Sequence, residues 1–115
     1  MSYNIIASEN FAKSLKSLAK RYRSMKSDYA ALLESLEQNP LQGVELRPGI
    51  RKIRMSITSK GRGKSGGARV ITYNVITSEI EGIVYLIDIY DKSDASTVDI
   101  NIIQKYVDEI NSKVE

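Results

Sequence analysis

The stretch "RKIRMSITSKGRGKSGGARVITYNVIT", from Arg51 to Thr77, decides the fold because it holds two strand patterns joined by a glycine-rich connection. Apolar and polar residues alternate from Lys52 to Ile57, which predicts a strand with its apolar side chains on one face and Lys52 and Arg54 on the other. "ARVITYNVIT" (68–77) is rich in β-branched and aromatic residues, which favours a strand buried on both faces. The connection is too short for a crossover, so the two strands are expected to be antiparallel.

The connection itself is strongly basic. The segment 59–70 contains four basic residues, four glycines and no acid. Its "GKS" is not part of a phosphate-binding P-loop, because that motif needs a glycine at the position of Thr58 and a helix after the serine. A strand pattern follows instead. A turn alone would not need these cations, so the loop is interpreted as a contact for phosphate groups.

The flanking sequence predicts the rest of a small α+β domain. "YNIIA" (3–7) is a short apolar run suited to a strand, and helical spacing extends over 9–22 after a possible cap at Ser8. A second helix, capped by Ser24 or Ser27, is expected to end near 38, and 41–50 is expected to be an irregular link. "GIVYLIDIY" (82–90) predicts the last strand, and 98–113 the last helix, with Ile102 or Ile103 facing inward. The expected order is β-α-α-β-β-β-α, with an N-terminal strand and a helical hairpin packed on a twisted antiparallel sheet, in one domain spanning 1–115.

Composition excludes several kinds of chemistry. The chain has no cysteine and no histidine, so it lacks a thiolate nucleophile, cysteine-bound zinc and the usual general base. No metal or cofactor is expected. The opening residues do not resemble a signal peptide, and no apolar run approaches the roughly 20 residues of a membrane helix. We therefore expect a cytoplasmic protein with no membrane partner.

Charge is segregated along the chain. No acid lies between Glu45 and Glu79, while eight basic residues do, and a second basic set occupies the first predicted helix and the residues after it. This segregation favours a polyanionic partner that contacts one face of the molecule. The simpler interpretation is a solvated surface, which is the usual case for charged residues on a single helix.

The motifs "FAKSLKSLAKRYRSMKSD", "GKSGGARVI" and "IYDKS", with the order of elements, make the chain resemble the RelE/ParE superfamily of type II toxin–antitoxin toxins, in particular its RelE/HigB-like branch. The resemblance spans nearly the whole chain. It implies an mRNA interferase, a metal-independent endoribonuclease that cleaves mRNA in the ribosomal A site by attack of the 2′-hydroxyl on the adjacent phosphorus. The implied partners are mRNA, rRNA and a cognate antitoxin. The toxin alone is expected to be a monomer that forms a larger complex with the antitoxin.

The resemblance also implies roles for individual residues. Arg69 would stabilise the transition-state phosphate, and of Lys52 and Arg54 one would be the base and the other would neutralise charge. Lys92 would contact the leaving group or the phosphate, and Tyr90 would stack on a base or act in catalysis. The loop cations Lys60, Arg62 and Lys64 would grip the RNA backbone.

Two questions stay open at the level of sequence. RelE proper has a tyrosine after the last strand, whereas this chain has none there before Tyr106, so the base is a lysine, Tyr90 or Tyr73. The function also has alternatives. ParE-like members of the superfamily inhibit DNA gyrase through protein contacts, and a third possibility is a module that binds RNA without cleaving it.

Overall fold

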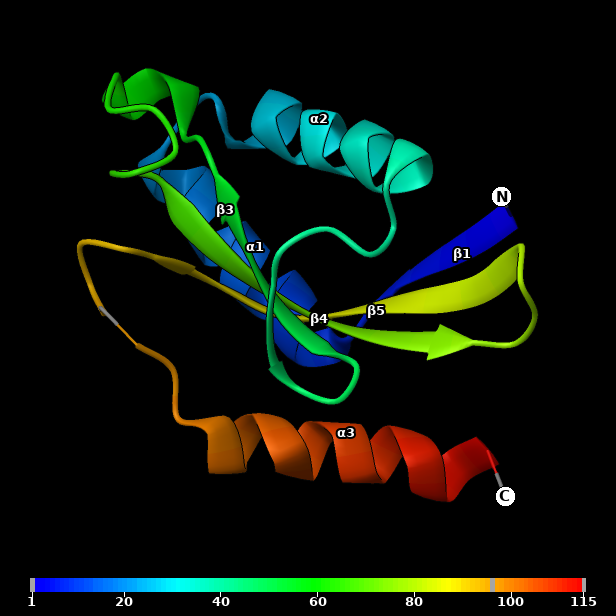
Figure 1. The fold of residues 1–115 in the computed structure, drawn as a ribbon. Helices are drawn as coiled ribbons and strands as arrows, with labels where there is room; N and C mark the ends of the chain where they lie inside the picture. The colour runs from blue at the N-terminus through cyan, green and yellow to red at the C-terminus, as the bar shows by residue number, and fades with distance from the viewer. Residues whose placement is uncertain (1, 96, 115) are drawn as a thin grey trace.

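The structure is a computed structural model that describes residues 2–95 and 97–114. Its elements, in chain order, are β1 (Ser2–Ala7), α1 (Glu9–Arg21), α2 (Met25–Gln38), β2 (Val44–Arg47), β3 (Ile50–Met55), the 3₁₀ turn η1 (Thr58–Lys60), β4 (Ala68–Ile76), β5 (Glu81–Asp91) and α3 (Ile100–Val114). The expected small α+β fold is thus confirmed (Figure 1).

The strands form one sheet in the order β1-β5-β4-β3-β2. Three of its neighbouring pairs are antiparallel, and two of these, β3–β4 and β4–β5, were expected. Strand β1 runs parallel to β5, so the sheet is mixed rather than wholly antiparallel. The expected irregular link at 41–50 was wrong in part, since 44–47 form β2. This strand has only four residues and lies between Gly43 and Pro48, so its sequence carries turn signals. Its pairing with β3 makes it a strand.

The helical hairpin α1–α2 covers one face of the sheet. Ser8 caps α1 as expected, since its hydroxyl accepts a hydrogen bond of 3.0 Å from the Phe11 N–H. Phe11 and Leu18 of α1, with Leu32 and Leu36 of α2, are buried against the apolar side chains of the central strands. The apolar face of β3 belongs to this core, which confirms that Lys52 and Arg54 lie on the opposite face.

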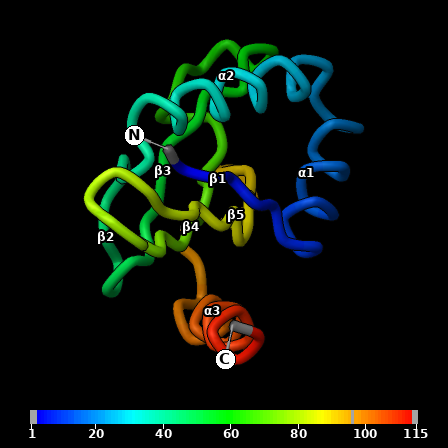
Figure 2. Tube along the Cα trace, turned by 90° about the vertical axis from the view of Figure 1, so that its right-hand side faces the viewer, coloured from blue at the N-terminus to red at the C-terminus, as the bar shows by residue number. Residues whose placement is uncertain are grey.

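The last helix, α3, covers only part of that opposite face. Figure 2 shows α3 on one side of the sheet and the α1–α2 hairpin on the other. Ile103 and Val107 of α3 are buried with Ile50, Ile71 and Ile87, whereas Ile102 is 49% exposed. The choice between Ile102 and Ile103 is therefore resolved in favour of Ile103. No helix among the described residues has both the length and the apolar character needed to cross a membrane.

A stability prediction follows from Thr72 in the centre of β4. Its side chain is fully buried, and its hydroxyl has no hydrogen-bond partner among the described residues. A buried unpaired hydroxyl costs about 1–3 kcal/mol, and valine keeps the same shape without it. Thr72→Val should therefore raise the free energy of unfolding by about 1 kcal/mol, measured by urea denaturation. Loss of stability would mean that the hydroxyl is paired.

Candidate nucleic-acid interface and active site

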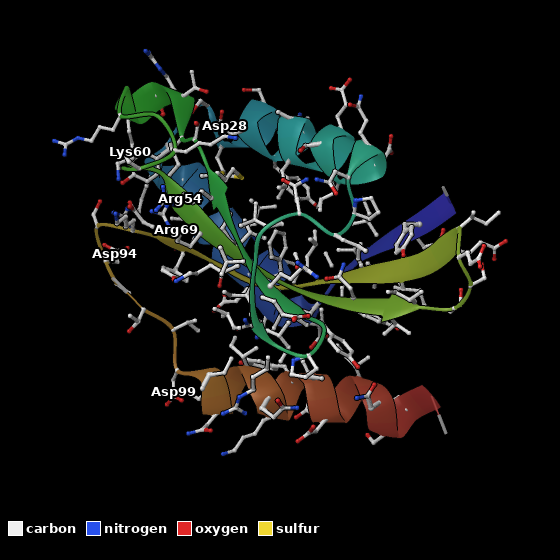
Figure 3. All side chains as sticks on the ribbon, in the orientation of Figure 1. Asp28, Arg54, Lys60, Arg69, Asp94 and Asp99 are labelled. Atoms are coloured by element: carbon white, nitrogen blue, oxygen red, sulfur yellow. The ribbon has the colours of Figure 1, made fainter. Side chains whose placement is uncertain are left out.

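Three of the predicted site residues lie in one row across the sheet. Arg54 of β3 is directly opposite Arg69 of β4, and Arg69 is directly opposite Tyr90 of β5. Directly opposed residues share a face of the sheet and lie about 5 Å apart. We call these three residues the cross-strand row. Figure 3 shows Arg54 and Arg69 side by side near the end of the sheet that carries η1.

The side chain of Arg69 is buried and not exposed to solvent. Only 5% of it is exposed, and its guanidinium donates to the carbonyl oxygens of Lys64 at 2.9 Å, Ala68 at 3.1 Å and Ser65 at 3.4 Å. Two of these carbonyls belong to the segment 61–67, which we call the glycine-rich loop. In this conformation Arg69 therefore holds the loop down over the sheet, and it meets a phosphate only after releasing those carbonyls.

Tyr90 ends the row with a buried phenol. Its hydroxyl is inaccessible to solvent and has no hydrogen-bond partner among the described residues. Burial raises the pKa of Tyr90 above the usual value, and the nearby charge of Arg69 only partly opposes this. The phenol is therefore protonated at neutral pH, so it is suited to donating a proton or a hydrogen bond rather than to acting as a base.

A buried carboxylate, Asp91, anchors the start of the loop. It accepts a hydrogen bond of 2.8 Å from the Lys60 ammonium, and further bonds from the Tyr22 hydroxyl and from the main chain and hydroxyl of Ser93. Its side chain is completely buried and that of Lys60 is 12% exposed. The Lys60 ammonium also lies 5.5 Å from the centre of the Tyr22 ring. This pair joins η1 to the end of β5 and to the end of α1.

The hydrogen bonds keep Asp91 ionised. Burial alone would raise its pKa, but the bonds from Lys60, Tyr22 and Ser93 together outweigh burial and hold the pKa of Asp91 well below the ordinary carboxyl value. The positive charge of Lys60 is compensated by Asp91 in this ion pair. In this conformation the Lys60 ammonium is bonded to Asp91 and Ser93, so its expected contact with the RNA backbone stays a prediction.

A second carboxylate, Asp28, fixes η1 to α2. Only 7% of Asp28 is exposed, and it accepts hydrogen bonds from the Ser24 hydroxyl at 2.7 Å, from the Thr58 N–H at 3.0 Å and from the Thr58 hydroxyl. The Ser24 hydroxyl also accepts a hydrogen bond of 2.9 Å from the Ser59 N–H. The chain therefore enters the glycine-rich loop from a turn that is held on two sides by buried acids.

The glycine-rich loop ends at Gly67, where the backbone lies so close to β3 that only glycine fits. A Cβ at Gly67 would lie 2.1 Å from the carbonyl oxygen of Met55, so any side chain would push the loop away from β3. The Gly67 carbonyl accepts a hydrogen bond of 3.0 Å from the Lys92 N–H. The exposed side chain of Lys92 thus begins beside the end of the loop.

The remaining cations are open to solvent. Arg54, Arg62, Lys64 and Lys92 are exposed, and none of them forms an ion pair within the part of the chain that the structure describes. Lys52 is half-buried on the same face as Arg54, two residues away along β3. Four uncompensated cations around one buried arginine and one buried phenol form a surface suited to a phosphate chain.

The second basic set lies on α1 and in the residues after it. Lys13, Lys16 and Lys20 are exposed on α1, and Lys13 lines a groove together with residues of α3. A polyanionic partner that contacts both basic sets stays a prediction. Periodicity placed the α1 cations away from the core, but sequence alone did not show on which side of the sheet α1 would lie.

Sequence reasoning missed the two anchoring acids. Asp91 lies inside the motif "IYDKS" (89–93), which was noted for its lysine and tyrosine, and its position directly after a buried apolar strand was the available signal. Asp28 carries no comparable signal, because an acid in the first turn of a helix is common.

A substitution at Asp91 tests the anchor. Asp91→Asn should lower the free energy of unfolding at pH 7 by about 3 kcal/mol, because breaking a buried pair leaves Lys60 without its counter-charge. The pKa of Asp91 in the folded protein lies below the unfolded value of about 4, so the carboxylate stabilises the fold above that pH and loses this effect as the pH falls below it. The difference from the unsubstituted protein should therefore be constant from pH 5 to 7 and shrink below about pH 4.

The matched control for this measurement is Asp94→Asn. Asp94 pairs with Arg21 at 2.7 Å, but both side chains are about half exposed, so its loss should cost less than about 1 kcal/mol. Equal effects of the two substitutions in urea titrations would show that Asp91 is not the anchor described here.

Comparison of the sequence with protein-family models and with curated proteins found no match. Any functional assignment of this chain therefore depends on its motifs and on the geometry described above.

Proposed function

We propose that this protein is a RelE-like toxin, a metal-independent endoribonuclease that cleaves mRNA in the ribosomal A site and so inhibits translation. The observation that carries the proposal is the cross-strand row of Arg54, Arg69 and Tyr90 under a basic glycine-rich loop. This row supplies cations for the phosphate and a protonated phenol within one site. It needs neither histidine nor cysteine, and the chain has neither.

The phosphate is the first requirement of the reaction. Attack by the 2′-oxygen forms a bond to phosphorus, breaks the bond from phosphorus to the 5′-oxygen, and gathers negative charge on the other phosphoryl oxygens. A guanidinium suits this charge because it donates two parallel hydrogen bonds. We assign the initial phosphate contact to Arg54, whose side chain is exposed and has no hydrogen bond to the rest of the described protein.

The base must accept the proton of the 2′-hydroxyl. Arginine does not lose its proton in proteins, so of Lys52 and Arg54 only Lys52 can act as a base. Tyr90 is disfavoured for the same step because its pKa is raised. We therefore assign the base to Lys52, which lies on the same face of β3 as Arg54, two residues away along the strand.

The 5′-oxygen needs a proton as it leaves. Tyr90 can donate it, since its phenol is protonated and has no internal partner to compete for that proton. Lys92, at the exposed end of β5, would neutralise charge on the departing strand. The products are a 2′,3′-cyclic phosphate and a 5′-hydroxyl end.

Access to the row requires the glycine-rich loop to move. Arg69 and the Tyr90 hydroxyl are covered in the described conformation, and Arg69 holds two carbonyls of the loop. Gly61 and Gly63 have positive φ angles of 69° and 61° and no neighbouring atoms where a Cβ would lie, so the loop tip is not packed against the body of the protein. RNA phosphates on Arg62 and Lys64 would replace the carbonyls as partners of Arg69 when the loop lifts.

The experiment is induced expression in bacteria that lack an antitoxin, with mRNA ends mapped within minutes. We expect growth arrest and new 5′-hydroxyl ends inside translated frames. Arg54→Ala should abolish both while leaving thermal unfolding unchanged, because no hydrogen bond of the fold depends on its side chain. Arg23→Ala removes the same charge from an exposed position in the α1–α2 connection, and it should leave cleavage intact.

Tyr90→Phe separates chemistry from binding. Because the hydroxyl has no internal partner, this substitution should not destabilise the fold, yet it should slow cleavage by a factor of about 10²–10⁴ if the phenol is the proton donor. Unchanged cleavage would remove Tyr90 from the reaction. Growth arrest with intact mRNA and inhibited DNA supercoiling would replace the whole proposal with gyrase inhibition.

A further inference from the structure

Strand β5 contains one extra residue, Ile87, relative to its partner β4. Ile71 of β4 lies opposite Asp88, whereas the next residue, Thr72, lies opposite Leu86. Ile87 therefore has no opposite residue, which makes it the extra residue of a β-bulge. A bulge changes the direction in which the side chains after it point, and bulges are common beside functional sites.

The bulge determines which face of the sheet Tyr90 occupies. Before the bulge, Leu86 packs in the core under the α1–α2 hairpin and Tyr85 packs on the side of α3. Strict alternation from Leu86 would place Tyr90 in the hairpin core, because every second residue of a strand shares a face. Instead Ile89 lies in the hairpin core and Tyr90 on the side of α3, opposite Arg69. The cross-strand row therefore depends on the extra residue.

The same shift turns Asp91 toward the hairpin. In an unbroken strand Asp91 would share a face with Tyr85 and would lie on the side of α3. In the structure it accepts a hydrogen bond from the Tyr22 hydroxyl at the end of α1 and one from the Lys60 ammonium. The row and the Asp91–Lys60 pair thus depend on one feature of β5.

Beyond the end of β1, side chains of α1 take the place of a neighbouring strand along β5. The pairing of β1 with β5 ends at Leu86, and no strand in the described part of the chain continues along that edge. The Ile87 carbonyl accepts hydrogen bonds of 3.0 Å from Nδ2 of Asn10 and 3.1 Å from the Ser8 hydroxyl. Asn10 is also joined to α3, because its Oδ1 accepts a bond of 3.3 Å from the Tyr106 hydroxyl.

Asp88 meets a second main-chain group that faces away from β4. The Lys92 N–H donates to the Gly67 carbonyl at 3.0 Å, so these residues form a hydrogen-bonded pair of the antiparallel ladder. Such pairs recur at every second residue, so the Ile89 N–H faces outward. It donates to Oδ1 of Asp88 at 2.8 Å, and the Ser14 hydroxyl of α1 donates to the same oxygen at 3.0 Å.

A regular register is the alternative that these side-chain bonds oppose. The Thr77 N–H donates to the Glu81 carbonyl at 3.0 Å, so every second residue from Glu81 onward bonds to β4 before the bulge. If this register continued, Ile87 and Ile89 would both bond to β4. The bulge therefore takes the Ile87 carbonyl and the Ile89 N–H away from the sheet and leaves them in need of other partners.

We propose that Asn10 and Asp88 are positioning residues, which hold the bulge at Ile87 and thereby place the Tyr90 phenol beside Arg69. They bond to the two main-chain groups that the bulge removes from the ladder, so their loss favours the regular register. The effect on cleavage rests on the proposed function. The register of β5 does not, and it is measured without RNA.

The register is read from cross-strand nuclear Overhauser effects (NOEs) in the isotope-labelled protein. The pair Val70–Ile89 is a non-hydrogen-bonded pair, so its two Hα atoms should give a strong NOE. In the regular register Val70 would instead lie opposite residue 88. Asp88→Ala should weaken the Val70–Ile89 NOE and produce one from Val70 to residue 88. Asp88→Asn is the matched control, because it removes the same charge but keeps an oxygen that accepts from the Ile89 N–H.

A second pair of variants tests the other contact. Asn10→Asp removes the donor to the Ile87 carbonyl and keeps an acceptor for the Tyr106 hydroxyl, so it should weaken the Val70–Ile89 NOE. Asn4→Asp adds the same charge at an exposed position of β1 and should leave that NOE unchanged. If Asp88→Ala does not fold, this pair decides the question.

Cleavage is measured on ribosomes that carry a defined mRNA. Asp88→Ala should lower the rate at saturating ribosome concentration by at least about tenfold, because the phenol is misplaced. The concentration that gives half the maximal rate should stay the same, since Lys52 and Arg54 are on β3 and do not move. Asp88→Asn should cleave at nearly the rate of the unsubstituted protein.

Any of three results would overturn the proposal. These are a Val70–Asp88 NOE in the unsubstituted protein, an unchanged Val70–Ile89 NOE in both Asp88→Ala and Asn10→Asp, and equal losses of cleavage in Asp88→Ala and Asp88→Asn. If the unsubstituted protein cuts no RNA, the proposed function fails, and the NOEs alone decide whether Asn10 and Asp88 hold the bulge.

Discussion

The candidate site depends on the buried ion pair between Asp91 and Lys60. Three elements that are distant in sequence meet at this pair: the end of α1 through Tyr22, the turn η1 through Lys60, and the end of β5 through Asp91 itself. A lone buried carboxylate would be unstable, but the hydrogen bonds around Asp91 make ionisation favourable. The pair therefore holds the start of the glycine-rich loop against the end of β5.

The sheet then determines which cations are available. Ile53 and Met55 of β3 and Val70 of β4 pack on the side of α1 and α2, so the alternating residues Arg54 and Arg69 lie together on the other face. Helix α3 covers the part of that face around Ile71 and Ile87 and leaves the end with Arg54 uncovered. The register of the strands places Arg54, Arg69 and Tyr90 directly opposite one another in one row across the sheet.

Much of this arrangement could be predicted from the sequence. Alternation in 52–57 placed Lys52 and Arg54 on the face opposite the core, and helical spacing after Ser8 predicted the helix that the structure shows as α1. Local pattern did not reveal β2, because a four-residue strand flanked by glycine and proline forms only when β3 lies beside it.

Local sequence pattern also could not predict which charged side chains are paired in the folded protein. Lys60, Arg62 and Lys64 look alike in the sequence, yet Lys60 is paired with a residue 31 positions away and the other two are exposed. Arg69 likewise bonds to loop carbonyls whose positions depend on the folded loop. Such assignments need the tertiary structure, because the partner of a charge is chosen by packing and not by spacing along the chain.

The central claim is that the cross-strand row and Lys52 cleave RNA by attack of the 2′-hydroxyl. The most direct measurement uses ribosomes stalled on an mRNA that carries a single 2′-deoxynucleotide on the 5′ side of a linkage mapped as cleaved. The account predicts that this linkage stays intact while the all-ribose mRNA is cut. Cleavage of the 2′-deoxy linkage at the same rate would contradict the account, because the bond would then break without the nucleophile on which the site is argued to act.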